Sequence, residues 1–433
     1  MSPADEVAGT IRAAEVAEST GSAGAHGREA AERVLLAQLG AAMVATGQPV
    51  HEIEDDLREV GIRLGYPDIQ LGVAPTGLLL SLRSGDPATY QSVGEPMRLD
   101  QAGEVRRVRH QLTTGELDAA GALEQLTGLR ARPGRYPRWL TPIAWVGICA
   151  GIALILQPGR DNVAVAAGCS LLVYALLALA KRARVMASLL PTVAAFAVTA
   201  LVFGAANAGW IEGPLRTVLP ALAPLLPGAL IVTGMSELAA GHMQAGASRL
   251  VHGIVQLGLF AVGLIAATTV LHVPAELMSN VRVDTIGWWA APAGLLLVAV
   301  GICLMESVEL SLAPWVLLVL LLAFGAQTGG NALGSAALGG FLGAIAASLG
   351  ATLVERLRPR SARLVVFLPA FWLLVPGSLG LIGATTLVAD PGHSLASGLG
   401  VAAGICAIAL GLLVGSSVEL ALRRRPRAAP TSP

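Results

Sequence analysis

The sequence is short of charged side chains, and the shortage falls on one part of the chain. Asp, Glu, Lys and Arg make up only 13% of its 433 residues, about half the usual share in soluble domains. Residues 1–138 hold 33 of these 58 side chains, and residues 139–422 hold 21. So little charge over such a length excludes a water-soluble domain there. It leaves room for many membrane spans of about 20 residues each.

Other scarcities exclude other classes of protein. The four cysteines lie in apolar runs and form no CxxC pair, which argues against a disulfide framework. The net charge is zero, so the composition does not indicate a nucleic-acid partner. The pair His51-Glu52 lacks a second histidine four residues after the first, and no glycine-rich phosphate loop is present. We therefore expect no metal, no cofactor and no enzyme.

Residues 28–138 are expected to form a soluble α+β domain in the cytoplasm. The preceding residues 1–27 are small, polar and acidic, and they lack the basic and apolar regions of a signal peptide, so we expect disorder there. Apolar residues at helical spacing predict one helix that ends at Gly47 and another over 53–64.

The rest of this domain is predicted to contain a hairpin and two helices. Strand-like runs at 69–73 and 78–83 are separated by a turn. Apolar residues at helical spacing over 105–112 predict a third helix. Thr113 and Glu116 have the spacing of a capping box, which predicts that a last helix opens at this point.

Ten apolar segments follow and are candidate membrane spans. They are 139–157, 162–180, 186–208, 215–235, 247–271, 286–305, 312–327, 331–354, 364–386 and 394–422. With the N-terminal domain in the cytoplasm, sixteen Lys and Arg residues fall on the cytoplasmic side and three outside, as the positive-inside rule requires. We therefore expect a multi-pass protein of the cell (plasma) membrane with both termini in the cytoplasm.

Glycine pairs four residues apart recur in these segments, and Gly147 with Gly151 is one of them. Small residues at this spacing let helices approach closely in a bilayer, so tight packing is the expected role of most pairs. The TGG stretch at 328–330 is expected to break the chain between the seventh and eighth spans.

Two stretches of the membrane part resemble each other. Residues 227–241 read PGALIVTGMSELAAG and residues 376–390 read PGSLGLIGATTLVAD, with six identities. Each lies in the fourth span of a five-span half, the halves being 139–272 and 283–422, and a basic tail follows at 423–433. Because five is odd, two such halves have opposite topology, as in the inverted repeats of secondary transporters. We predict a mainly α, polytopic membrane protein of about ten helices in two inverted repeats behind a small α+β domain.

The two Pro-Gly pairs predict a substrate site. Proline interrupts the backbone hydrogen bonds of a span. The helix that resumes presents free N–H groups and the positive end of its dipole to an anion, such as the carboxylate of an amino acid. A simple kink filled by neighbouring side chains is the alternative. The candidate substrate-binding residues are Pro227, Gly228, Ser236, Gln327, Asn331, Pro376, Gly377 and Ser378.

Ionisable residues at membrane depth are costly and therefore indicate function. The candidates for proton coupling are Glu237, His242, Arg249 and His252. Histidine titrates near neutral pH, which suits this role. Arg249 also fits the positive-inside count, and Glu237 also fits a place in reach of cytoplasmic water.

Long stretches of the chain resemble the threonine/serine exporter family. In the soluble domain they include LLAQLGAAMVATGQPVHEIEDDLREVGIRLGY and VAPTGLLLSL, and in the membrane part LLPGALIVTGMSELAAGHMQAGASRLVHG and FLPAFWLLVPGSLGLIG. After the first Pro-Gly the family has an Asp-Leu and a Gly-Asp pair, where this chain has Glu237-Leu238 and Gly241-His242. The first change keeps the negative charge, and the second removes a carboxylate.

The resemblance implies export of L-threonine and L-serine, driven by the proton motive force, through a ten-span membrane part behind a cytosolic domain. The expected partners are these small amino acids, protons and the lipid bilayer, and self-association of the chain is left open. A membrane channel, or a signalling or sensor protein with a regulatory cytosolic domain, is the alternative. An intramembrane protease is disfavoured because no HExxH motif and no nucleophile elbow is present.

Overall fold

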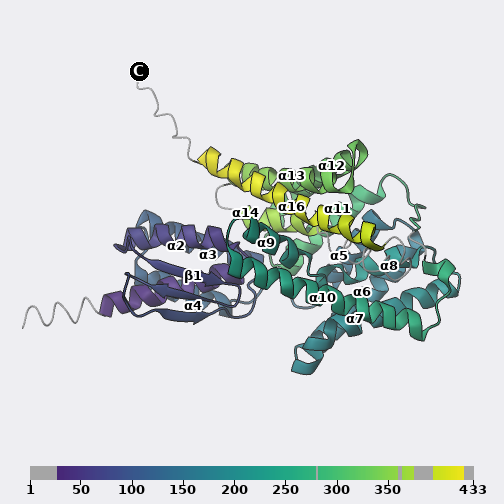
Figure 1. Cartoon of the computed structure of the whole chain (residues 1–433), viewed down its shortest axis with the longest axis horizontal. Helices are drawn as coiled ribbons and strands as arrows, with labels where there is room; N and C mark the ends of the chain where they lie inside the picture. The colour runs from purple at the N-terminus through teal and green to yellow at the C-terminus, as the bar shows by residue number, and fades with distance from the viewer. Residues whose placement is uncertain (1–26, 279–280, 359–362, 375–393, 424–433) are drawn as a thin grey trace, which may run out of the picture. The chain divides into compact units, whose positions relative to one another are not determined.

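A computed structural model describes residues 27–278, 281–358, 363–374 and 394–423. The chain divides into two compact units, one within residues 1–97 and 104–132 and the other within 98–103 and 133–433. Each unit is described separately below, with the elements labelled as in Figure 1.

The first unit combines helices with a small antiparallel sheet. A helix over 27–45 precedes α2 (Val50–Leu64). The sheet is followed by α3 (Leu99–Thr114), of which residues 104–114 belong to this unit, and by α4 (Ala119–Ala131). The strands are β1 (Gln70–Ala74), β2 (Gly77–Ser81) and β3 (Thr89–Ser92), in the order β1-β2-β3. The register pairs Gly72 with Leu79 and Leu79 with Tyr90.

Alternation along β2 explains which face of the sheet is covered. Leu78 and Leu80 are buried, whereas Leu79 between them is half exposed, because successive side chains of a strand point to opposite faces. The buried face packs against the first two helices, since Leu78 of β2 and Leu57 of α2 both lie against Gly40 of the first helix. These helices and the β1–β2 hairpin match the prediction, while β3 was not predicted.

The predicted capping box in this unit is wrong. α3 continues through Thr114, so Thr113 lies inside its last turn. α4 begins only at Ala119, and the carboxylate of Asp118 accepts a hydrogen bond from the backbone N–H of Gly121 at 3.0 Å. Asp118 is therefore the N-cap, and its short acidic side chain suits that position.

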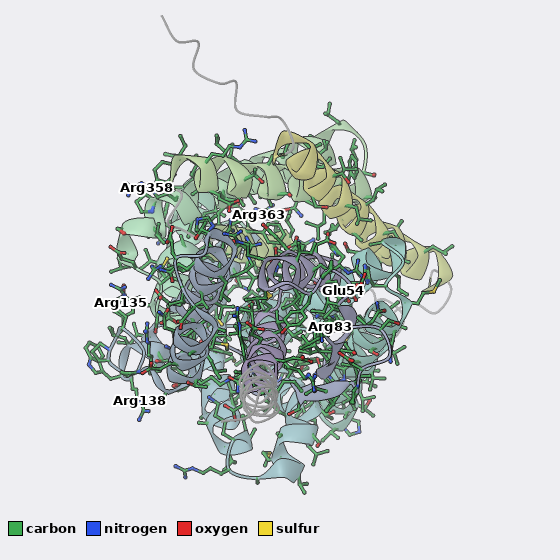
Figure 2. The ribbon with its side chains drawn as sticks, turned by 90° about the vertical axis from the view of Figure 1, so that its left-hand side faces the viewer. Glu54, Arg83, Arg135, Arg138, Arg358 and Arg363 are labelled. Atoms are coloured by element: carbon green, nitrogen blue, oxygen red, sulfur yellow. The ribbon has the colours of Figure 1, made fainter. Side chains whose placement is uncertain are left out.

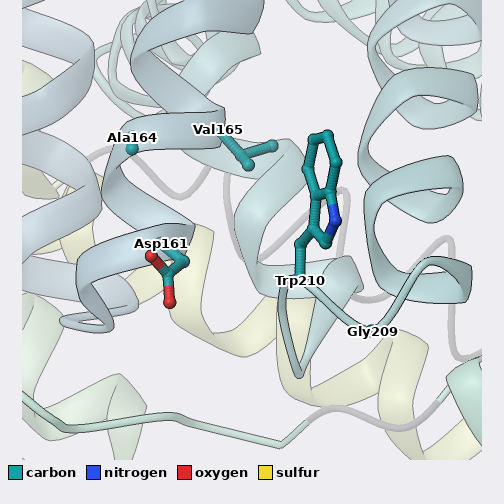
Figure 3. A pocket seen from close by; sticks show the side chains of 5 residues that line it. All are labelled: Asp161, Ala164, Val165, Gly209 and Trp210. Carbon is teal, nitrogen blue, oxygen red and sulfur yellow. The ribbon is translucent and has the colours of Figure 1, made fainter.

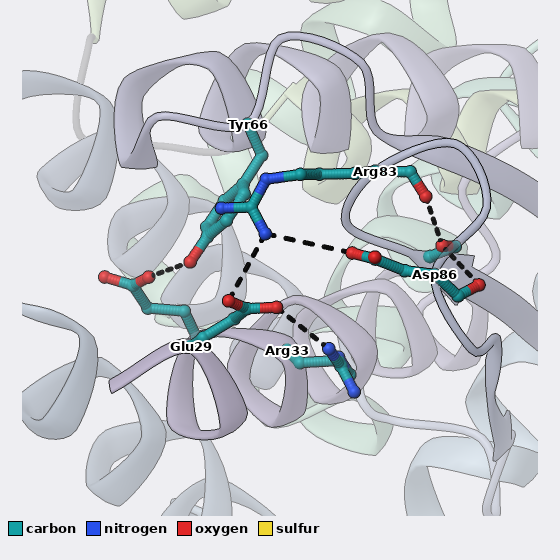
Figure 4. A network of polar contacts seen from close by, with 7 residues as sticks. Glu29, Arg33, Tyr66, Arg83 and Asp86 are labelled. Carbon is teal, nitrogen blue, oxygen red and sulfur yellow. Dashed lines mark hydrogen bonds and ion pairs between the residues drawn. The ribbon is translucent and has the colours of Figure 1, made fainter. Parts of the chain in front are cut away.

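A polar network fixes the first helix to the sheet (Figure 4). The buried Glu32 carboxylate accepts hydrogen bonds from the Tyr66 hydroxyl at 2.5 Å and from Arg28 Nε at 2.9 Å. Arg83, just after β2, binds Glu29 at 3.3 Å, and its guanidinium lies 5.2 Å from the centre of the Tyr66 ring. Burial, together with the hydrogen bond to Glu32, raises the pKa of the Tyr66 hydroxyl to about 12.

The second unit is helical. Its helices are α5 (Leu140–Leu156), α6 (Arg160–Ala180), α7 (Arg184–Asn207), α8 (Pro214–Leu222), α9 (Gly228–Ala239), α10 (Met243–Val270), α11 (Ala290–Met305), α12 (Ala313–Leu333), α13 (Ala336–Leu357), α14 (Arg363–Leu374) and α16 (Ser394–Arg423). Among the described residues, six helices are long and apolar enough to cross a bilayer, or seven if the bent pair of α8 and α9 is one span. The chain is therefore a multi-pass membrane protein.

The break predicted at residues 328–330 is absent. α12 runs without interruption to Leu333, and the chain turns at Gly334. Glycine weakens helices in water partly because it exposes the backbone to solvent. In a bilayer no water competes for the backbone groups, so a helix through two glycines is retained.

α5 and α11 cross backbone to backbone (Figure 1). A Cβ on Gly151 would lie 2.6 Å from the carbonyl oxygen of Gly294, and a Cβ on Gly301 would lie 3.0 Å from that of Ala144. The later residue of α5 thus meets the earlier residue of α11, and the reverse holds for the second contact. The two helices therefore run antiparallel, held at a distance that only small residues permit.

Two further crossings repeat the same contact. Gly263 of α10 faces the carbonyl of Thr192 in α7, and Gly411 of α16 faces the carbonyl of Phe341 in α13. The separation in sequence is 149 residues from Thr192 to Phe341 and 148 from Gly263 to Gly411. Equivalent positions about 149 residues apart therefore make equivalent contacts, and Pro227 and Pro376 have the same spacing.

The apolar side chains of this unit form two buried clusters. One contains Val218 and Leu222 of α8 together with side chains of α5, α6, α7 and α10. The other contains Val232 of α9 together with side chains of α11, α12, α13, α14 and α16. We call them the first core and the second core. The chain passes from one to the other between α8 and α9.

Tyr66→Phe is expected to lower the free energy of unfolding by about 2 kcal/mol, because it removes a hydrogen bond to the buried Glu32 carboxylate. Tyr90→Phe, at an exposed tyrosine, is the control. The folded-state pKa of about 12 lies above the unfolded value of about 10. The contribution is therefore complete below pH 10 and is lost as pH rises through 12. A tyrosinate difference titration of wild type minus Tyr66→Phe that has its midpoint near pH 10 would contradict this.

Gly151→Ala is expected to destabilise the second unit by about 1–3 kcal/mol, because the new methyl group collides with the Gly294 backbone. Gly147→Ala on the same helix meets nothing within 4 Å and is expected to be neutral or slightly stabilising, since alanine favours helix. Thermal unfolding of the full-length protein in detergent measures both. Equal effects of the two substitutions would count against the crossing.

Candidate functional site

The helix break predicted at the first Pro-Gly pair is present. A short 3₁₀ turn at Ala223–Leu225 ends α8, Leu226 is extended, and α9 begins at Gly228 with Pro227 as its N-cap. The axes of the two helices differ by 66°. Proline forces the preceding residue out of the helical region and offers no N–H of its own, which explains a break at this point.

The break leaves the backbone donors in the first turn of α9 without partners in their own helix. The N–H groups of Gly228, Ala229 and Leu230 have no carbonyl one turn earlier in the helix, whereas the N–H of Ile231 already donates to Pro227 O at 3.1 Å. The positive end of the α9 dipole lies at the same place. This turn is the part of the described chain that best matches the predicted anion-binding feature.

At its other end α9 turns back into α10 and packs closely on it. Gly241 has φ +92°, a left-handed conformation that glycine adopts without strain, and it makes the turn tight. A Cβ on Gly234 would lie 2.8 Å from the carbonyl oxygen of Gly246, and a Cβ on Gly253 would lie 2.6 Å from Ile231. The two backbones are therefore in direct contact along this hairpin.

The close packing brings together two of the predicted residues as a buried ion pair. Arg249 Nε of α10 lies 3.3 Å from Glu237 Oε2 of α9, and the side chains are 8% and 0% exposed. Two opposite charges removed from solvent remain ionised only when they compensate each other. The sequence indicated each residue separately and did not predict the pair. The glycine at 241, between Glu237 and Arg249, is the feature of the sequence that could have indicated a tight turn and hence the pair.

The other residues predicted for proton coupling lie close to this pair along the chain. His242 is the N-cap of α10 and is half-buried, and its backbone N–H donates to Glu237 O at 2.9 Å. His252 lies three residues beyond Arg249 and is exposed. Ser236, predicted to bind substrate, is buried beside Glu237 on α9.

Two predicted substrate residues belong to another part of the second unit. Gln327 and Asn331 are one turn apart on the continuous α12. Gly339 of α13 faces the Asn331 side chain and the Gln327 carbonyl, so both lie at the crossing of α12 with α13. The remaining three, Pro376, Gly377 and Ser378, lie outside the described residues.

An open pocket of about 580 Å³ lies elsewhere in the unit (Figure 3). Its walls are Asp161 and Val165 of α6 and Trp210 after α7, with the Trp210 ring across the pocket from the Asp161 carboxylate. None of the predicted site residues lines it. Within the described ranges, no three His, Cys, Asp or Glu side chains are grouped to hold a metal ion.

Comparison with known proteins identifies one relationship. The model of a family described as "Putative threonine/serine exporter" (ThrE) matches residues 34–271. The matched range covers most of the first unit, the break at Pro227 and the Glu237–Arg249 pair. No curated protein and no solved structure matches the chain.

Glu237→Gln and Arg249→Met are each expected to destabilise the second unit by about 3–5 kcal/mol, because each removes one member of a buried ion pair. The double variant is expected to recover most of this loss, since it removes both charges. Thermal unfolding of the full-length protein in detergent gives the double-mutant cycle. Losses that simply add in the double variant would show that the two side chains do not compensate each other.

Proposed function

Because the chain belongs to the threonine/serine exporter family, we propose that it is a secondary transporter that exports L-threonine and L-serine across the cell membrane. The observation that carries the proposal is the broken span within the matched range, which has backbone donors without helix partners at its break and a buried ion pair at its end. An anion-binding helix start and a buried titratable pair are the elements that proton-coupled amino-acid transport needs. Membership of a transporter family also favours transport over catalysis.

We propose ten spans arranged as two inverted halves, 139–272 and 283–422, behind a cytosolic domain at 28–138. Besides the helices long enough to cross a bilayer, α5 and α11 are shorter apolar helices, and α14 begins a ninth span. The antiparallel crossing of α5 with α11 supports the inversion, since it relates the first helix of each half by opposite directions. The repeated glycine contacts about 149 residues apart support equivalent halves.

The proposed orientation places both termini in the cytoplasm. Three arginines of the second unit, Arg135, Arg138 and Arg358, support it through their neighbours (Figure 2). Arg135 and Arg138 flank Tyr136, whose hydroxyl donates to the carbonyl of Val308 just after α11. The Arg358 guanidinium lies 5.6 Å from the centre of the Trp315 ring in the first turn of α12. Basic residues from separate loops thus gather where α11 ends and α12 begins, as expected of one cytoplasmic face.

In the proposed mechanism the first turn of α9 binds the substrate carboxylate, and the second Pro-Gly pair contributes in the same way from the other half. Glu237 or His242 exchanges protons at the opposite end of α9. Nine residues of helix separate Gly228 from Glu237, or about 14 Å. Substrate and proton therefore do not share one contact. Coupling depends on movement of α9, which carries both groups.

Protonation of Glu237 is the step that changes the electrostatics of the pair. A neutral Glu237 no longer compensates Arg249, so the contact between α9 and α10 weakens when the proton binds. Export against a gradient requires that proton and substrate occupy the carrier alternately. A channel or a sensor needs no such alternation, and this difference separates the alternatives.

Efflux of threonine from cells preloaded with a threonine dipeptide tests the proposal. A protonophore, Glu237→Gln and His242→Ala are each expected to slow efflux at least tenfold, since each removes the proton or a group that carries it. Glu276→Gln, at an exposed glutamate, is the matched control and is expected to behave as wild type. Inside-out vesicles are expected to accumulate labelled threonine and serine only with an imposed proton gradient. Equilibration without accumulation would indicate a channel.

A further inference from the structure

Three uncharged polar side chains are buried at one end of the helices of the first core. Gln157 follows α5, Asn162 lies in the first turn of α6, and Thr217 lies in the first turn of α8. They are 0%, 3% and 0% exposed. Buried amides and hydroxyls are costly unless they form hydrogen bonds, so their partners indicate what the cluster does.

Asn162 and Thr217 join the start of α6 to the start of α8. Asn162 Nδ2 donates to Thr217 Oγ1 at 2.8 Å and to the carbonyl of Glu212 at 2.7 Å. Thr217 Oγ1 donates in turn to the carbonyl of Gly213 at 3.3 Å. Both bonded carbonyls belong to the loop that leads into α8, so the loop and the first turn of α8 are held together against α6.

Gln157 extends the cluster to the segment between α10 and α11. Its amide nitrogen lies 3.3–3.4 Å from the carbonyls of Glu212, Gly213 and Val281, and its amide oxygen accepts from the N–H of Val283 at 3.2 Å. One side chain thus joins three loops that are far apart in sequence. Gly213 has φ +59° and lies against Val281 and Gln157, so only glycine fits between them.

The anchored helix is one side of the break at Pro227. Eight of the nine residues of α8 are buried, and the helix packs in the first core beside α5, α6 and α7 (Figure 1). α9 starts two residues after Leu226, packs along α10 and contributes Val232 to the second core, where it contacts α16. The break therefore separates α8, which is tied at its far end to the first core, from α9, which packs between α10 and the second core.

We propose that Gln157, Asn162 and Thr217 form a clamp that keeps α8 fixed to the first core, so that conformational change during transport takes place at the joint formed by Leu226, Pro227 and Gly228. The three are positioning residues, because their polar groups bind other parts of the protein. Gln157 uses both ends of its amide in this way, and Asn162 and Thr217 bind each other. The role in transport rests on the proposed export function. The clamp and the joint do not, since they are properties of the chain itself.

Hydrogen exchange measured by mass spectrometry on the full-length protein in detergent tests the clamp without any substrate. Thr217→Val keeps the shape of the side chain and removes its hydroxyl, and Gln157→Leu removes the amide. Both are expected to speed amide exchange in residues 212–222 at least tenfold. Thr217→Ser retains the hydroxyl and is expected to restore the wild-type rate. Thr269→Val is the matched control, because that hydroxyl bonds only to Ile265 O of its own helix.

Two results of this measurement would overturn the inference. Unchanged exchange over 212–222 in both Thr217→Val and Gln157→Leu would show that no clamp exists. Exchange in wild type that is no faster at 223–230 than within α8 would show that the break is not a joint. Both results stand whether or not the protein carries threonine.

Efflux of threonine from dipeptide-loaded cells tests the role in transport. Thr217→Val is expected to lower the maximal rate at least fivefold and to leave the half-saturating threonine concentration within twofold, because the first turn of α9 is untouched. Thr217→Ser is expected to recover the rate. A variant with faster amide exchange but wild-type efflux would show that the clamp has no role in transport. Absence of threonine efflux in the wild type would instead contradict the proposed function. The exchange data would still show whether the clamp exists.

Discussion

The arrangement of the membrane helices depends on close approach of backbones at positions that lack a side chain. Lipid tails are as apolar as leucine, so helices in a bilayer gain little from burying apolar surface against each other and associate mainly through van der Waals contact. Gly151, Gly294 and Gly301 permit that contact between α5 and α11. Gly263 and Gly411 permit it again, in crossings of α10 with α7 and of α16 with α13. A methyl group at any of these sites would separate helices that hold the unit together.

The same constraint decides where charge is tolerated. Gly234 and Gly246 let α9 and α10 touch, and the contact places Arg249 beside Glu237 with almost no exposure of either. An ionised side chain inside a membrane protein needs a partner of opposite charge. In the proposed mechanism, a proton that neutralises one member changes the packing of both helices. This proposed link between protonation and helix contact is the reason for assigning the pair to coupling.

Uncharged polar side chains form the hydrogen bonds of buried loop carbonyls near the start of α8. Gln157 and Asn162 satisfy carbonyls of loops that no regular hydrogen-bond ladder reaches. Their bonds hold α8 at the end remote from the break, while Pro227 frees α9 to pack in the second core. The broken span is thus hydrogen-bonded to neighbouring loops where the amides bind it and interrupted where proline removes a donor. A site at the interruption would be shaped by both cores.

Local chemistry explains which features were predictable. The deficit of charge over 139–422 identified a membrane protein, and the two strand-like runs with a turn between them in 69–83 identified a hairpin, because both features depend on residues close together in sequence. The break at Pro227 was predictable for the same reason, since proline acts on its own peptide bond and on the residue before it. The break expected at 328–330 failed, because a glycine run interrupts a helix only when something else satisfies its backbone.

Tertiary structure alone decided which of these residues meet. Gly147 and Gly151 are equivalent in sequence, yet only Gly151 touches another helix. Glu237 and Arg249 form a pair because the hairpin aligns their faces, and Gln157 binds Val281 across 124 residues of chain. Composition and periodicity determine how each segment folds and whether it enters a bilayer. The rotation and register of one helix against another depend on the shapes of both surfaces, and no local pattern in either segment contains that information.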